Sequence, residues 1–459
     1  MFQINFHKPI HIHFIGIGGI SMSGLAEILL KENFRISGSD AKRSALTTHL
    51  ELLGCTVQYG QCAENITDDI DAVVYTAAIH PDNPEFAACK AKGIPMLSRA
   101  ELLGQLMHNY KVSIAISGTH GKTTTTSMLS EILMLADTDP TVSVGGILKS
   151  INGNIRVGGP EMFVTEACEY TNSFLNFYPT DSIILNIEED HLDFFKDIHD
   201  IRRSFHQFAS QTADGGSVII NADIPDYEEI TADINASVIT FGLEHEAMYT
   251  ATDISFDGFG HPSFTVVKNG TPGIQCALKV PGIHNVSNAL AVIALCDRLG
   301  IPAETIRKGL LAFEGTDRRF EYKGTFQGVT VIDDYAHHPT EIAATLTAAR
   351  NYPHRTIWCV FQPHTYTRTK ALLPEFARAL KLADKVVLAD IYAARETDTL
   401  GISSRTLQEA LQKEGAEAYY FPSFEQIENF LKKNCVHGDL LITMGAGDVV
   451  NIGENLVEK

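Results

Sequence analysis

The chain has 459 residues, of which 44% are hydrophobic and 20% charged, and its formal net charge at pH 7 is −20. This length predicts about three domains of roughly 150 residues each, and no run approaches the roughly 18 apolar residues of a membrane span, so we expect no membrane insertion. The acidic balance opposes binding to nucleic-acid phosphates, so we expect no nucleic-acid partner.

The first predicted unit is an apolar strand, a glycine-rich turn and an amphipathic helix, with the sequence GIGGISMSG at 16–24. A second strand at 34–38 leads to Ser39-Asp40. In a dinucleotide fingerprint, an acid about 20 residues after the glycines binds a ribose. Ser21 replaces the third glycine of that fingerprint. The turn therefore favours a nucleotide diphosphate on a helix N-terminus over a NAD site.

Alternating helices and strands continue this unit, with helices near 46–53, 84–92 and 100–108 and strands at 72–76 and 95–97. The alternation predicts an α/β domain of about 110 residues. Thr76 ends one of its strands, which is where open α/β sheets bind ligands. An ordinary loop role for Thr76 is the alternative.

The stretch from 112 to 135 combines a strand, a phosphate-type loop and a helix. The apolar strand runs into Gly118-Thr119-His120-Gly121-Lys122-Thr123-Thr124, and apolar residues then recur at helical spacing. Backbone N–H groups of such a loop bind phosphate, Lys122 reaches outer phosphates and Thr123 offers a hydroxyl to Mg²⁺. The usual GxxxxGK[ST] spacing requires glycine where Ile116 stands. The loop is therefore a short form that predicts a nucleoside triphosphate site; a glycine turn without a ligand is the alternative.

Two later strands, at 162–165 and 182–185, each end in carboxylates. Glu166 follows the first strand, and in a P-loop domain an acid at such a position holds Mg²⁺ directly or through water. His191 lies in the acidic loop after the second strand. Imidazole is an unusual Mg²⁺ ligand, so from the residues alone a structural role for His191 is favoured over metal binding.

Residues 248–280 lose the α/β alternation and predict short strands, a small β excursion on the central domain. A helix follows from about 283. Asn285 and Asn288 share one face of it, where carboxamides can read an adenine edge. Capping of the helix by Asn285 is an equal alternative.

The last third of the chain predicts another α/β region in which four strands end in polar loops. The carboxyl ends of parallel strands meet at one edge of a sheet, so these loops predict a second substrate face. Pro339 and Thr340 can also serve only to start a helix. The loops are at 333–341, 362–368, 390–396 and 445–448.

The order of these motifs resembles the Mur ligase family, and the resemblance runs through all three predicted domains. The carrying segments are GIGGISMSG (16–24), SGSD (37–40), GTHGKTTTT (118–126), EACEYTNSF (166–174), NIEEDHLD (186–193), HNVSNA (284–289), DRRFE (317–321), DDYAHHPTE (333–341) and QPHTYTRT (362–369).

The resemblance implies an α/β fold of three domains. These are a Rossmann-like UDP-sugar domain at 1–109, a central P-loop ATPase-type domain with the β excursion at 110–315, and a Rossmann-like amino-acid domain at 316–459. It also implies an amide-forming ligase that depends on ATP and Mg²⁺. Such a ligase would join L-alanine to the carboxylate of UDP-N-acetylmuramate through an acyl phosphate. The product would serve peptidoglycan precursor synthesis.

Three alternatives stay open at this point. A murein-peptide recycling ligase of the same family would use a tripeptide in place of L-alanine. A NAD-dependent oxidoreductase is suggested by the first glycine turn and Asp40, but it leaves the phosphate loop, Glu166 and Arg319 without a purpose. A non-catalytic nucleotide-binding module would bind ATP without turnover.

The resemblance also implies roles for individual residues. The UDP-sugar would be bound by Gly16, Gly18, Gly19, Ser21, Met22, Ser23, Asp40 and Thr76. ATP would be bound by Gly118, Thr119, His120, Gly121, Lys122, Thr123, Thr124, His284, Asn285 and Asn288 (the last three at adenine), with Arg319 at the γ-phosphate and Asp334 at the ribose. Magnesium would be held by Thr123, Glu166 and His191, and the amino acid and acyl phosphate by Tyr335, His337, His364 and Arg368. The catalytic set would be Lys122, Arg319, His337, His364 and Arg368, with His337 or His364 as general base.

The chain departs from the family pattern at two places. The usual EADES reads Glu166-Ala167-Cys168-Glu169-Tyr170, so a role for position 168 is in doubt. Several Mur-type ligases use a carbamoylated lysine one helix after the metal histidine, but residues 197–211 contain no lysine. We therefore do not expect that modification.

The eight cysteines include no C-x-x-C pair, and the N-terminal residues lack the basic and apolar regions of an export signal. Both features predict reduced thiols in a cytoplasmic protein. A monomer or a homodimer is expected.

Overall fold

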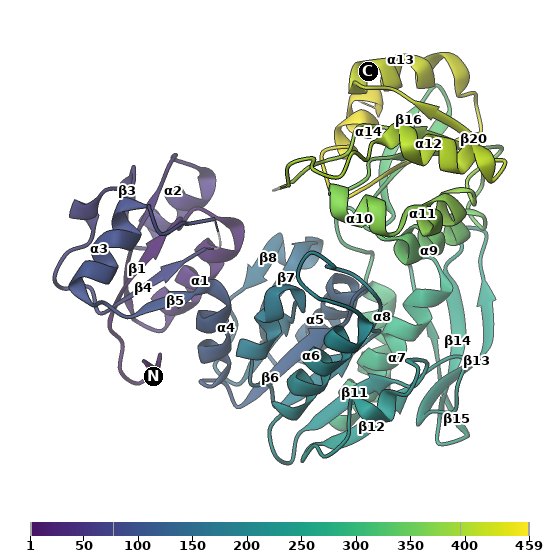
Figure 1. The fold of residues 1–459 in the computed structure, drawn as a ribbon. Helices are drawn as coiled ribbons and strands as arrows, with labels where there is room; N and C mark the ends of the chain where they lie inside the picture. Colours follow the sequence, from purple (N-terminus) through teal and green to yellow (C-terminus); the bar gives the residue numbers. More distant parts are fainter. Residues whose placement is uncertain (1, 77, 395, 458–459) are drawn as a thin grey trace.

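The computed structural model describes residues 2–76, 78–394 and 396–457, and it contains three sheets that follow one another along the chain (Figure 1). The central sheet lies between the N-terminal and C-terminal regions in the ribbon view. Arg395, in one of the predicted polar loops, lies outside the described residues. The fold is the expected three-domain α/β architecture. Among the helices described, none is both long and apolar enough to cross a membrane.

The N-terminal sheet has five strands in the order β3-β2-β1-β4-β5, and all of its neighbouring strands are parallel. This Rossmann-like arrangement places the glycine turn of 16–19 at the carboxyl end of the first strand, where helix α1 begins. The elements are β1 (His11–Ile15), α1 (Ile20–Lys31), β2 (Arg35–Asp40), α2 (Ala45–Leu52), β3 (Thr56–Tyr59), β4 (Ala72–Tyr75), α3 (Pro84–Lys92), β5 (Met96–Ser98) and α4 (Arg99–Met107).

The central sheet has ten strands in the order β15-β14-β13-β12-β11-β10-β6-β9-β7-β8. The strand before the phosphate loop, β6, lies between β10 and β9 and is parallel to both, so the acidic ends of β9 and β10 flank the loop. The elements up to β12 are β6 (Val112–Ser117), α5 (Lys122–Leu135), β7 (Thr141–Leu148), β8 (Gly153–Arg156), β9 (Met162–Glu166), β10 (Asp181–Ile184), α6 (Ile198–Ser210), β11 (Ser217–Asn221) and β12 (Ser237–Phe241).

The predicted β excursion is an antiparallel extension of this same sheet. Strand β13 is parallel to β12 over a short register and antiparallel to β14, which pairs antiparallel with β15. Helices α7 and α8 follow it and pack on the central domain. The elements are β13 (Tyr249–Phe256), β14 (Pro262–Lys268), β15 (Thr271–Ala277), α7 (Ile283–Arg298) and α8 (Ala303–Ala312).

The C-terminal sheet has six strands in the order β16-β17-β21-β18-β19-β20, and only the pairing of β16 with β17 is antiparallel within the described sheet. The four strands with polar loops are therefore parallel neighbours, as the sequence predicted. The elements are β16 (Glu321–Phe326), β17 (Val329–Asp334), α9 (Pro339–Ala349), β18 (Ile357–Phe361), α10 (Tyr366–Ala371), α11 (Leu373–Leu380), β19 (Lys385–Leu388), α12 (Ser404–Lys413), β20 (Glu417–Tyr420), α13 (Phe424–Asn434), β21 (Leu440–Met444) and α14 (Val450–Val457).

The N-terminal and central domains share one hydrophobic core. Leu102 and Leu106 of α4 belong to the same buried cluster as Phe163 of β9 and Phe208 of α6. Tyr110, just before β6, stacks on Phe163 with ring centroids 5.1 Å apart. The first domain is thus packed onto the second by apolar surface.

Gly104 permits the closest approach at this junction, because a Cβ built there would lie 1.8 Å from the carbonyl oxygen of Asn176. Gly104→Ala should push α4 away from the central domain and lower the free energy of unfolding by about 1–3 kcal/mol. Gly258→Ala is the control, since a Cβ on Gly258 would meet no atom within 4 Å, and it should change stability by about 0.5 kcal/mol or less. Urea unfolding measures both; equal midpoints would refute the close contact.

Candidate active site

The phosphate loop needs glycine at two positions. Gly118 has φ +143° and Gly121 has φ +83°, conformations that L side chains rarely adopt. A Cβ on Gly118 would lie 2.9 Å from Leu185, and a Cβ on Gly121 would lie 2.8 Å from the Asn288 side-chain oxygen. The loop backbone therefore lies directly against β10 and α7, and α5 begins immediately at Lys122.

Lys122 is held by its own loop and by one acid. Its Nζ donates to the carbonyl oxygens of Gly118 and Thr119 and lies 2.9 Å from Oε2 of Glu169, which is 3% exposed. Burial opposes the charged form of Lys122, but attraction by Glu169 outweighs it and raises the lysine pKa. The ammonium is therefore charged at neutral pH and faces the cavity beside the loop.

The predicted magnesium residues lie around this cavity. Thr123 hydrogen bonds to Glu166, whose carboxylate also accepts from the Gly145 N–H, and burial raises the pKa of Glu166. His191 stacks on Tyr170 with centroids 4.4 Å apart, and burial lowers its pKa. Its Nε2 lies 3.7 Å from Oε1 of Glu169. This donor set is dominated by hard oxygens, as Mg²⁺ requires.

Glu169 is the residue here to which the sequence assigned no role. Its Oε1 is buried and has no hydrogen-bond partner among the described residues, although its Oε2 pairs with Lys122. A buried carboxylate oxygen without a partner is costly unless a cation or water completes it. The unpartnered oxygen of Glu169 therefore fits a magnesium ligand. The sequence feature that could have predicted this is the second acid of the EACEY segment.

A second cavity lies between α5, α7 and α9. It is lined by Thr124, Asn285, Asn288, Phe313 and Asp334 together with His120, His284 and Arg319. Asn285 does not cap α7: Gly282 is the cap residue, and Asn285 donates to the Pro281 carbonyl oxygen at 2.8 Å. The capping alternative is therefore wrong. Asn288 donates to Asn285 at 3.1 Å, so the two carboxamides form one polar face of the cavity.

Asp334 ends β17 at the wall of this cavity. It accepts from the backbone N–H groups of Phe320 and Ala336 at 2.9 and 2.8 Å. Burial raises its pKa to about 6, although Arg319 opposes the shift. Its position at a strand end fits contact with a ribose hydroxyl.

Adjacent arginines have different surroundings. Arg318 pairs with buried Asp333 at 2.9 Å and donates to the carbonyl oxygens of Gly445 and Gly447. Arg319 lies 3.8 Å from Glu341. Both guanidinium groups lie over the Tyr335 ring, at 5.0 and 5.3 Å, and both line the cavity beside the phosphate loop, but Arg319 also lines the second cavity. Arg318 therefore ties the β21 loop to β17, whereas Arg319 has a weaker ion pair and adjoins both cavities.

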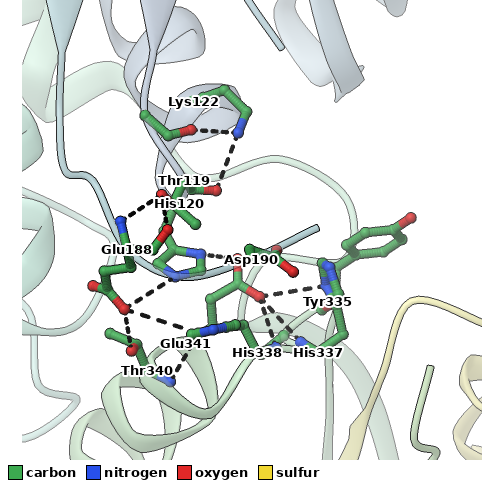
Figure 2. Close-up of polar contacts among 12 residues, drawn as sticks. Thr119, His120, Lys122, Glu188, Asp190, Tyr335, His337, His338, Thr340 and Glu341 are labelled. Carbon is green, nitrogen blue, oxygen red and sulfur yellow. Dashed lines mark hydrogen bonds and ion pairs between the residues drawn. The ribbon is translucent and has the colours of Figure 1, made fainter. Parts of the chain in front are cut away.

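His120 connects the phosphate loop to the C-terminal domain (Figure 2). Its Nε2 lies 3.5 Å from Glu188, its Nδ1 lies 3.3 Å from Glu341, and its ring packs against His338 at 4.6 Å. Burial disfavours the imidazolium, but the two carboxylates outweigh burial and raise the His120 pKa to about 9. Thr340 also donates to Glu188 across the junction. These contacts hold α9 against the phosphate loop.

The predicted amino-acid residues surround a third cavity. Tyr335, His364 and Arg368 line it directly, together with Asp190 and His191. His337 lies on the adjoining cavity beside the phosphate loop, where burial lowers its pKa to about 4 although Glu341 opposes the shift. The rings of His337 and His364 are 5.7 Å apart. The structure thus brings both candidate bases together near Arg368.

Arg368 makes a buried ion pair that the sequence did not predict. Its Nε donates to Asp190 of the central domain at 2.9 Å, and its Nη1 lies 3.1 Å from His364. Both partners are nearly buried, with 9% and 7% exposure. Burial opposes ionisation of Asp190, but Arg368 outweighs it and lowers the Asp190 pKa. Arg368 therefore joins two domains at the wall of the third cavity.

Removing this arginine should be costly. Arg368→Ala leaves Asp190 buried without its partner, so we expect the free energy of unfolding to fall by about 3–5 kcal/mol and the KM for the amino acid to rise. Arg350→Ala is the matched control, because Arg350 and Asp384 are also 2.9 Å apart but exposed, and it should cost at most about 1 kcal/mol. Denaturant unfolding and amino-acid titrations measure both. Equal losses in the two variants would contradict the buried pair.

The three cavities adjoin one another. The second cavity and the one beside the phosphate loop share the lining residues His120, Gly121, Arg319 and Glu341. The phosphate-loop cavity and the third share Asp190, His191 and Tyr335. The cavities therefore form a row from the carboxamides of α7, past Lys122, to Arg368.

The glycine turn of the N-terminal domain is closed by Asp40. Its Oδ2 accepts from the Gly18 N–H at 2.8 Å, and Gly16 has φ +83°.

The predicted sugar-binding residues that follow lie at the start of α1. Gly19 is the N-cap residue of this helix, and Ser21 lies in its first turn. Met22 is buried in the core, and Ser23 donates its hydroxyl to the Ile20 carbonyl oxygen and its N–H to the Gly19 carbonyl oxygen, so neither the Met22 side chain nor the Ser23 N–H is available to a ligand. Thr76 accepts from Ala78 and lies beside Gly16.

Comparison with known proteins gives consistent matches along the chain. Family models match in order: "Mur ligase family, catalytic domain" at 11–111, "Mur ligase middle domain" at 116–296 and "Mur ligase, glutamate ligase domain" at 318–447. The UDP-N-acetylmuramate–L-alanine ligases of Agathobacter rectalis and Lachnospira eligens are 64% and 61% identical, each match covering 100% of both chains. The UDP-N-acetylmuramate–alanine ligase structure from Thermotoga maritima has a TM-score of 0.79 at 32% identity, covering 98% of both chains.

A murein peptide ligase structure from Psychrobacter arcticus is similar at a lower level. Its TM-score is 0.70 at 26% identity, and the match covers 98% of both chains. The alanine ligases are thus more similar to this chain in both sequence and structure.

Proposed function

The chain belongs to the Mur ligase family, and on that premise we propose that it is the ATP-dependent ligase that joins L-alanine to the carboxylate of UDP-N-acetylmuramate, a step of peptidoglycan precursor synthesis. The row of three adjoining cavities carries this proposal on the structural side. It provides adjoining places for a nucleotide, a reacting carboxyl group and an amine. The two relatives that match this chain over its whole length support this activity over that of a NAD-dependent oxidoreductase and over a non-catalytic module.

We assign the three substrates to three domains. ATP lies on the central domain, 110–315, with adenine against Asn285 and Asn288, and its ribose reaches Asp334 of the C-terminal domain. The UDP-sugar lies on the N-terminal domain, 1–109, at the glycine turn beside Asp40. L-alanine lies on the C-terminal domain, 316–459, between Tyr335, His364 and Arg368.

In this reaction the sugar-lactyl carboxylate attacks the γ-phosphoryl group, giving an acyl phosphate and ADP, and the amine of L-alanine then displaces phosphate to form the amide. Lys122 and Arg319 stabilise charge that develops on the phosphoryl oxygens, which is where most phosphoryl-transfer catalysis lies. When bound, Mg²⁺ would supply further charge neutralisation on the phosphates; Thr123, Glu166, Glu169 and His191 would hold it. His337 and His364 are the candidate bases for the incoming ammonium.

His337 is held as a neutral imidazole, although its lowered pKa makes it a weaker base than a solvated histidine. Burial lowers its pKa to about 4, so its imidazole is neutral at pH 7. Its Nδ1 lies 3.0 Å from the Tyr335 carbonyl oxygen, so we assign the N–H to Nδ1 and the lone pair to Nε2. His364 instead contacts Arg368 through its Nδ1.

Phosphate release from ATP tests the proposed function. The full chain is incubated with Mg²⁺ and UDP-N-acetylmuramate, and then with L-alanine, glycine, L-serine or the tripeptide L-alanyl-γ-D-glutamyl-meso-diaminopimelate. We expect release with L-alanine and little with the tripeptide. Release with the tripeptide alone would favour a murein-peptide recycling ligase, and no release with any acceptor from folded protein would refute the ligase.

A further inference from the structure

A cluster of two imidazoles and one carboxylate joins the central and C-terminal domains outside the magnesium residues. His120 and Glu188 come from the loops after β6 and β10, and His338 precedes α9. One ligand atom from each of the three residues lies within 4.8 Å of the other two. His120 Nε2 is 3.5 Å and His338 Nδ1 is 3.9 Å from Glu188 Oε2. Figure 2 shows the three side chains converging from the two domains.

The remaining atoms of these side chains are held by partners. His338 Nε2 contacts the Glu189 carbonyl oxygen at 3.0 Å, which places the N–H there. Its Nδ1 accepts from the Thr340 backbone N–H at 3.3 Å and caps α9, so a metal ion on Nδ1 would replace that long cap bond. His120 Nδ1 contacts Glu341 at 3.3 Å, which leaves Nε2 toward Glu188. Thr340 donates to the same Glu188 carboxylate. Metal-binding histidines usually donate their other N–H to a carboxylate or carbonyl oxygen in this way, and ligating carboxylates are themselves hydrogen-bonded.

One ring nitrogen in the cluster is also left incomplete. His120 Nε2 is buried and makes no well-formed hydrogen bond in the part of the chain described here, although Glu188 Oε2 lies 3.5 Å away. Zinc ligands at about 2.0–2.2 Å in tetrahedral geometry are about 3.4 Å apart. The two distances to Glu188, 3.5 and 3.9 Å, are close to this value, and the two imidazole nitrogens lie within 4.8 Å of each other, so binding requires the two rings to close around the ion.

We propose that His120, Glu188 and His338 form a site for a borderline transition-metal ion of the Zn²⁺ class, and that the ion ties the central domain to the C-terminal domain. Two imidazoles favour Zn²⁺, Co²⁺ or Ni²⁺ over Mg²⁺, whereas the oxygen-rich residues around Glu166 favour Mg²⁺. The site also borders the nucleotide cavity through His120 and Glu188.

Zinc binding by the tag-free full chain, without nucleotide, tests the proposal. Equilibrium dialysis against Zn²⁺ should find one site that His338→Gln and Glu188→Gln each weaken at least about tenfold. His49→Gln is the matched control, because His49 and Glu27 are also 3.5 Å apart but exposed, and it should leave binding unchanged. Zn²⁺ should raise the thermal midpoint of the wild type and of His49→Gln, but not that of the two site variants.

A spectroscopic measurement on the wild type guards against misfolded variants. X-ray absorption at the zinc edge should show nitrogen and oxygen ligands that include two imidazoles. A sulfur ligand would assign the ion to one of the cysteines and overturn the proposal. Unchanged zinc affinity in folded His338→Gln and Glu188→Gln would also overturn it.

Discussion

Lys122→Ala should lower the rate of ATP-dependent ligation about 100- to 1,000-fold, because removing one preorganised charge at a transition state typically costs that much. The binding of UDP-N-acetylmuramate should stay nearly intact, since Lys122 belongs to the central domain and the glycine turn of 16–19 to the N-terminal one. Steady-state kinetics and calorimetric titration with the UDP-sugar measure the two effects separately.

Two further variants control this result. Lys111→Ala removes an exposed lysine whose partner Glu161 is also exposed, and it should leave turnover unchanged. Lys122→Arg keeps a cation beside buried Glu169, so it separates loss of catalysis from loss of folding. If Lys122→Ala abolished UDP-sugar binding while the chain stayed folded, the division of substrates between the domains would be wrong.

Arg319→Ala and Arg318→Ala should separate catalysis from stability at neighbouring positions. Arg319 faces the cavities, so its loss should lower kcat about 100- to 1,000-fold and change the free energy of unfolding by about 1 kcal/mol or less. Arg318 pairs with Asp333, which is 0% exposed, so its loss should cost about 3–5 kcal/mol of stability. Rate measurements and denaturant unfolding on both variants test this contrast. Full activity in folded Arg319→Ala would remove it from the proposed mechanism.

Local signals in the sequence predicted most of the elements. Helix α3 occupies the predicted residues 84–92 because Asn83 caps it, Pro84 starts it and Gly93 ends it at φ +66°. The strand, loop and helix predicted at 112–135 also agree with the structure to within one residue, because the apolar strand, the glycines and the helical spacing of apolar residues are local patterns. Signals of this kind lie within a few residues of the element they define, so one sequence is enough to read them.

Contacts between distant segments were not predictable in this way. Capping of the helix by Asn285 was one of two equal interpretations, but Gly282 takes that position with φ +98° and ψ 149°, a backbone conformation that is essentially confined to glycine. The role of Glu341 depends on His120, more than two hundred residues earlier, and the pair of Arg368 with Asp190 spans 178 residues. Glu169 stood beside Glu166 in sequence, yet only the folded chain shows that it meets Lys122.

Isotope transfer tests the central claim most directly. UDP-N-acetylmuramate labelled with ¹⁸O in its lactyl carboxylate is incubated with the full chain, ATP, Mg²⁺ and L-alanine, and phosphate and product are analysed by mass spectrometry. An acyl phosphate requires one ¹⁸O in each phosphate released and one alanyl amide formed per phosphate. Unlabelled phosphate, or ADP formed without the amide, would contradict carboxylate activation as the reaction of this site.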